Sequence, residues 1–79
     1  MPKLPVISGK EMVKFLQKQG FEIVAQKGSH VRLKKRTVIE VLVTVVPLHG
    51  NADLKPGLLH DILKQAGIER DDFIKLLRK

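Results

Sequence analysis

The residue best suited to chemistry in this chain is a histidine at the start of a basic strand. Residues 27–34 read Lys-Gly-Ser-His-Val-Arg-Leu-Lys. Because side chains on a strand alternate between its faces, His30, Arg32 and Lys34 project together, and the apolar residues between them point into a core. A group that exchanges a proton near neutral pH, flanked by fixed positive charge, suits cleavage of a phosphodiester. The alternative is a solvated basic strand without a catalytic role.

Other kinds of catalytic site find little support in the sequence. The chain has three histidines and no cysteine, and their spacing does not match a zinc site. Ser29 and His30 do not form a nucleophile pair, since neighbouring strand residues point to opposite faces. No glycine-rich segment forms a nucleotide-binding loop. We therefore expect neither a metal nor a small-molecule cofactor.

The charge balance points to a polyanionic partner. The formal net charge is +7 over 79 residues, which favours nucleic acid first and an acidic protein second. An anionic membrane is not expected, because no basic amphipathic segment carries a large apolar face. The absence of Trp and Tyr argues against a platform on which bases stack.

Candidate phosphate contacts fall in two groups, a helical stripe and the basic hairpin. Each group has a plain alternative, a solvated lysine face for the helix and a soluble hairpin tip for the strands. The candidate residues are Lys10, Lys14, Lys18, Lys27, Ser29, Arg32, Lys34, Lys35 and Arg36.

The elements that position these residues follow from caps and periodicity. After a lead-in over residues 1–7, Ser8 and Glu11 have the spacing of a capping box, and Gly20 is a helix stop, which predicts a helix over 9–19. Strands are expected over 21–26, 30–34 and 38–46. Pro56 suits the first position of a second helix that Gly67 ends. A third helix is expected over 70–77, burying its apolar side chains Phe73, Leu76 and Leu77.

Strand register is predicted by requiring apolar residues to share a face. Three-residue loops at 27–29 and 35–37 satisfy that requirement. The expected pairs are Ala25–Val31, Ile23–Leu33, Glu22–Lys34, Leu33–Ile39, Val31–Val41 and Arg32–Glu40. The outer face would then hold Val24, Leu42 and Val46 beside His30 and Arg32. His30 would lie opposite Leu42, far from His49 if the strand continued straight, but the turn of the chain at Pro47 leaves their separation open.

The order α-β-β-β-α-α predicts one α+β domain over residues 1–79, with helices packed on one face of a three-stranded antiparallel sheet. This is the order of the double-stranded RNA-binding fold. The N-terminus lacks the apolar run of a signal peptide, and the apolar stretch over 38–48 is too short to span a bilayer. We expect a soluble, cytoplasmic protein.

At this level the sequence resembles the HicA family, also called YcfA-like. The resemblance covers nearly the whole chain and is carried by Gly28-Ser29-His30, by Val46-Pro47-Leu48-His49-Gly50, and by the run from Leu54 through Leu63-Lys64-Gln65-Ala66-Gly67 to Phe73. Glu69 departs mildly, since members often have a Ser or Thr helix cap there. The resemblance implies a toxin of a type II toxin–antitoxin system, an mRNA-cleaving ribonuclease neutralised by a HicB antitoxin.

The family's essential histidine falls on His30, which would act as acid or base without a metal. His49 is interpreted first as a loop residue, and His60 as solvated. Two alternatives remain, a non-catalytic RNA-binding module of the same fold and a domain that binds an acidic protein. We expect the antitoxin to cover the outer sheet face around His30, Arg32 and Leu42.

Overall fold

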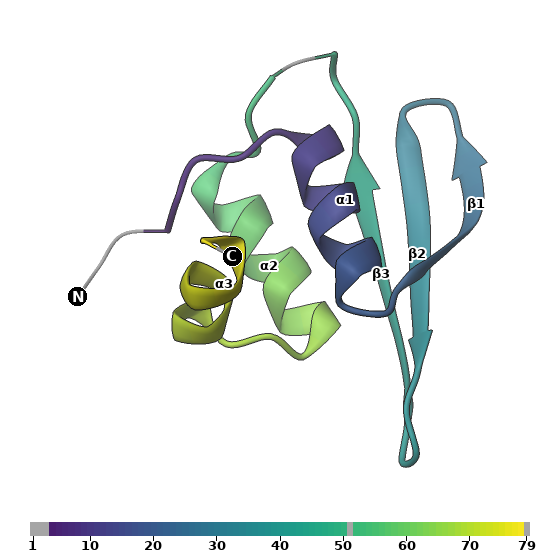
Figure 1. Ribbon diagram of the computed structural model, residues 1–79. Helices are drawn as coiled ribbons and strands as arrows, with labels where there is room; N and C mark the ends of the chain where they lie inside the picture. Colours follow the sequence, from purple (N-terminus) through teal and green to yellow (C-terminus); the bar gives the residue numbers. More distant parts are fainter. Residues whose placement is uncertain (1–3, 51, 79) are drawn as a thin grey trace.

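The computed structural model describes residues 4–50 and 52–78 and has the predicted order of elements (Figure 1). Residues 1–3 of the lead-in lie outside the described part. The helices and strands are α1 (Gly9–Lys18), β1 (Glu22–Lys27), β2 (His30–Arg36), β3 (Val41–Pro47), α2 (Pro56–Ala66) and α3 (Arg70–Leu77). Helices and a three-stranded antiparallel sheet confirm the α+β class. No helix among the described residues is long and apolar enough to cross a membrane.

The first helix begins at the capping box that the sequence predicts. The Ser8 hydroxyl accepts from the Glu11 amide at 3.2 Å, and the Ser8 amide donates to the Glu11 carboxylate at 3.3 Å. The helix ends at Lys18, one residue before the predicted limit, with Gln19 as its C-cap. Its apolar stripe is buried, so the opposite stripe of lysines faces solvent.

The C-terminal helices α2 and α3 contribute to the same hydrophobic core as α1. As predicted, α2 starts at Pro56 and ends at Gly67, whose φ of 70° is the left-handed conformation that glycine adopts readily. In α3, Phe73 is fully buried and meets Phe15 of α1 edge to face, with ring centroids 4.9 Å apart. The other two predicted core residues of α3, Leu76 and Leu77, are half-buried and pack against that core.

The β1–β2 hairpin differs in part from the predicted register. The pairs Glu22–Lys34 and Ile23–Leu33 are confirmed. The turn, however, has two residues rather than three, so Lys27 pairs with His30. A β-bulge between Ile23 and Ala25 absorbs the extra residue, and Ala25 pairs with Arg32 instead of Val31.

The predicted β2–β3 register is wrong, because the loop spans four residues, 37–40. The Thr37 hydroxyl donates to the Glu40 carbonyl at 2.9 Å and accepts from the Glu40 amide at 3.0 Å, which closes a compact turn. Val38 and Ile39, expected in the strand, lie exposed in this turn. The observed partners are Val31–Val46, Arg32–Val45, Leu33–Thr44, Lys34–Val43, Lys35–Leu42 and Arg36–Val41.

In the observed register, each side chain of β3 lies on the opposite face of the sheet from the one predicted. Val46 is fully buried and Leu42 packs against the core, so both lie on the inner face rather than the predicted outer one. The outer face receives Val41, Val43 and Val45, which are partners of basic residues. Helices α1 and α2 lie on the same side of the sheet, and the β2–β3 hairpin extends beyond them (Figure 1).

Candidate active site

His30 is the first residue of the central strand, β2, and lies on the open sheet face at one end of the sheet. It follows the two-residue turn directly and pairs with Lys27 on one side and Pro47 on the other. Paired residues share a face, so the Lys27 side chain lies next to the imidazole. Together with Ala25, Arg32 and Val45, these two residues line a shallow depression of about 500 Å³.

Positive charge dominates this depression. Lys27 and Arg32 are its only charged lining residues within the described part of the chain, and both are exposed. On β2, Lys34 and Arg36 continue the same face away from His30. We call Lys27, Arg32, Lys34 and Arg36 the basic column; it would hold a chain of phosphates along one line that starts at the imidazole.

The other candidate contacts lie elsewhere. Lys10, Lys14 and Lys18 sit on the solvent side of α1, in the helical layer rather than on the open sheet face. Lys35 is on the inner face, and its ammonium lies 5.9 Å from the centre of the Phe21 ring. Ser29 is in the turn, where its carbonyl accepts a hydrogen bond from Leu48.

The observed register places His30 opposite the end of β3 rather than its middle. The expectation that His30 lies opposite Leu42 is wrong, because its partner is Pro47. The Leu48 amide donates to Ser29, which extends the ladder one residue beyond β3 and leaves His49 as the next residue. Sequence reasoning left the relation of His49 to His30 open, because it depends on a loop length. His60 is exposed on α2.

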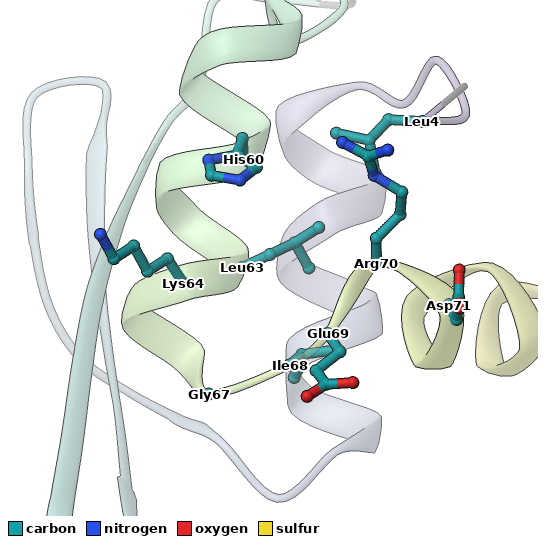
Figure 2. Close-up of a pocket in the computed structure, with 9 residues that line it drawn as sticks. All are labelled: Leu4, His60, Leu63, Lys64, Gly67, Ile68, Glu69, Arg70 and Asp71. Atoms are coloured by element: carbon teal, nitrogen blue, oxygen red, sulfur yellow. The ribbon is translucent and has the colours of Figure 1, made fainter. Parts of the chain in front are cut away.

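A larger cavity of about 720 Å³ lies on the helical side of the molecule (Figure 2). Arg70 extends from the first turn of α3 toward Leu4 across it. The lining residues are Leu4, His60, Leu63, Lys64, Gly67, Ile68, Glu69, Arg70 and Asp71. Its charges have both signs, so it lacks the uniform positive potential of the His30 depression. Within residues 4–50 and 52–78, no three acidic or histidine side chains gather as a set of metal ligands.

Comparison with known proteins identifies a family for this chain. A family model described as the HicA toxin of bacterial toxin–antitoxin matches residues 9–68. This span runs from the start of α1 to just beyond α2 and includes every residue that lines the His30 depression. No curated protein matches the chain.

Proposed function

The chain belongs to the HicA toxin family of bacterial toxin–antitoxin systems, and from this premise we propose that it is a metal-independent endoribonuclease that cleaves mRNA. The observation that carries the proposal is the depression in which His30 meets Lys27 and Arg32. It joins a proton carrier to two permanent cations on an exposed face. A strand of RNA has access to such a face.

The chemistry needs only groups present on this face and in the RNA. A ribose 2′-oxygen forms a bond to the adjacent phosphorus while the bond from phosphorus to the 5′-oxygen breaks. His30 takes the proton from the 2′-hydroxyl or gives one to the leaving 5′-oxygen. Lys27 and Arg32 stabilise the additional negative charge of the pentacoordinate phosphorus. The products carry a 2′,3′-cyclic phosphate and a 5′-hydroxyl.

A second proton carrier makes this reaction more efficient, and we assign that role to His49. The Leu48 amide donates to the Ser29 carbonyl just beyond β3, so the chain that carries His49 leaves the sheet at the same end as His30. In the sequence, His49 is two residues beyond Pro47, the partner of His30. One histidine then acts as base while the other acts as acid.

The test is cleavage of a long mRNA transcript in the presence of EDTA by the natural chain and by His30→Ala. We expect the variant to cleave at least about a hundredfold more slowly, the usual range for a removed acid or base. His60→Ala is the matched control, because His60 is also exposed but lies on α2. RNA binding and the circular dichroism spectrum of each variant establish that the fold is retained.

The same assay separates the enzyme from its runner-up, a non-catalytic RNA-binding module. The basic column supports binding whether or not cleavage follows. If neither the natural chain nor His30→Ala cleaves RNA while both bind it, the module is the correct function. If EDTA abolishes cleavage by the natural chain, the metal-independent mechanism is wrong.

A further inference from the structure

Strand β3 forms an edge of the sheet, and its outward main-chain groups are unpaired within the part of the chain that the structure describes. β3 is the last strand of the order β1-β2-β3, and no other described segment pairs with its outer side. Hydrogen bonds from Thr37 to Glu40 and from Leu48 to Ser29 mark the two ends of its ladder with β2. Since bonded pairs alternate along an antiparallel ladder, the amides and carbonyls of Val41, Val43 and Val45 point away from β2.

The side chains at this edge are apolar. Val41 and Val43 are 49% and 44% exposed, and β3 contains no charged residue. In the adjoining turn, Val38 and Ile39 are 103% and 87% exposed. We call Val38, Ile39, Val41, Val43 and Val45 the apolar edge. Proteins usually protect a bare edge of this kind, because it accepts a strand from another chain.

The opposite edge shows the protection that β3 lacks. β1 carries the bulge between Ile23 and Ala25, which disrupts pairing with an added strand. It also presents charged side chains at both ends, Glu22 and Lys27. The two edges of one sheet are therefore unequal, and only β3 offers a regular run of free amides and carbonyls.

We propose that the β3 edge binds an extended segment of an acidic protein by adding a strand to the sheet. Alternating apolar side chains of that segment would cover Val41 and Val43, and its carboxylates would meet Lys34 and Arg36 on the neighbouring strand. RNA does not suit this edge, because β3 offers neither cations nor aromatic rings. A second copy of the chain does not suit it either, since each copy carries a net charge of +7.

The antitoxin partner that the family requires is the acidic protein we assign to this edge. The assignment depends on family membership and not on the nuclease activity of His30. Its experimental test therefore uses binding, and the result stands whether or not the chain cleaves RNA.

Amide hydrogen exchange tests the proposal on the natural chain with its cognate antitoxin. We expect the amides of Val41 and Val43, which lie outside the His30 depression, to exchange at least about tenfold more slowly in the complex. Gln26 is the internal control, because its amide points outward at the β1 edge and is expected to be unchanged. Unchanged valine amides in a formed complex would overturn the proposal. So would protection of the same amides by RNA, or by raising the concentration of the chain alone.

Variants provide an independent test that keeps the ladder between β2 and β3 intact. Val43→Pro removes one outward amide, and Val43→Thr keeps it. Of these two variants, the proline variant alone should lose antitoxin affinity, by about tenfold or more. Gln26→Pro makes the same change at the other edge and should bind normally. Val43→Glu, which keeps the amide but places a negative charge against the acidic segment, should weaken binding too. Equal affinity of all four variants would contradict strand addition, and retained RNA binding shows that each is folded.

Discussion

At the scale of single residues, the one buried polar side chain of β3 has a specific partner. Thr44 is 1% exposed, and its hydroxyl donates to the Gln65 side chain of α2 at 2.8 Å. Gln65→Ala removes the acceptor from a buried donor, and we expect it to lower the free energy of unfolding by about 1–2 kcal/mol. Urea denaturation measures this loss.

A double variant identifies the cause of that loss. Adding Thr44→Val to Gln65→Ala removes the unsatisfied hydroxyl, so stability should recover most of the difference. If the double variant is as unstable as Gln65→Ala alone, the lost packing of the glutamine stem is responsible, and the hydrogen bond contributes little.

The role assigned to His49 can be separated from a purely structural one. The carbonyl of His49 accepts from the Ala52 amide at 3.0 Å, so the turn after β3 uses main-chain groups that a side-chain substitution preserves. We expect His49→Gln to reduce the rate of cleavage about a hundredfold and to remove one limb of the pH–rate profile. His60→Gln should change neither. A slower His49→Gln enzyme with an unchanged profile would indicate that His49 only positions the substrate.

At the scale of elements, the start of α1 is packed against the end of β3 through a glycine. A Cβ at Gly9 would lie 2.5 Å from the Pro47 carbonyl oxygen, which is too close for any side chain. Gly9→Ala should therefore destabilise the protein by about 1–3 kcal/mol, as overpacking does. Gly57, in the first turn of α2, has nothing within 4 Å of the same position. Gly57→Ala should be stabilising by about 0.5–1 kcal/mol, and thermal unfolding of the pair measures the contrast.

The helices could be predicted from the sequence because their ends are encoded locally. The capping box at Ser8, Pro56 at the start of α2 and Gly67 at its end are each recognisable from one or two residues. The register of β3 on β2 could not be predicted, because valines occupy both faces of β3. Requiring apolar residues to share one face therefore could not choose between registers, and the correct one places a threonine in the core. The hydroxyl of that threonine is satisfied by Gln65, which is 21 residues away in sequence.

The candidate site was predicted only in part, because strand alternation can be read from the sequence but loop lengths cannot. Alternation along β2 correctly places His30, Arg32 and Lys34 on one face, since that strand is regular. Lys27 joins them through the short turn, and Val45 through the four-residue loop, and neither loop length is evident from composition. The same alternation places Lys35 on the inner face. Grouping Lys35 with the other basic residues as a candidate phosphate contact overlooked this.

At the scale of the whole molecule, the positive charge is divided between the open sheet face and the helical layer. Replacing Lys27, Lys34 and Arg36 with serine removes as much charge as replacing Lys10, Lys14 and Lys18. RNA that reaches His30 lies along the basic column, so the first set should lower the slope of log affinity against log salt by about 2–3. The second set should change it by less than about 1.

Affinity measured between 50 and 200 mM salt checks this prediction, with about a thousandfold loss expected for six phosphate contacts of the natural chain. Equal effects of the two sets would show that RNA wraps onto the helical layer. A natural chain whose RNA affinity hardly depends on salt would instead favour the acidic protein as its main charged partner.

The open sheet face is divided by strand, with the basic column on β1 and β2 and the apolar edge on β3 and its turn. This division has an evolutionary consequence. If the β3 edge binds the antitoxin as proposed, substitutions at Val41 or Val43 would alter that recognition without touching the residues around His30. Lineages could then diverge in the antitoxin that they accept while the residues proposed to cleave RNA are inherited unchanged. Related toxin–antitoxin pairs within one cell could in this way lose cross-recognition through a few substitutions in β3.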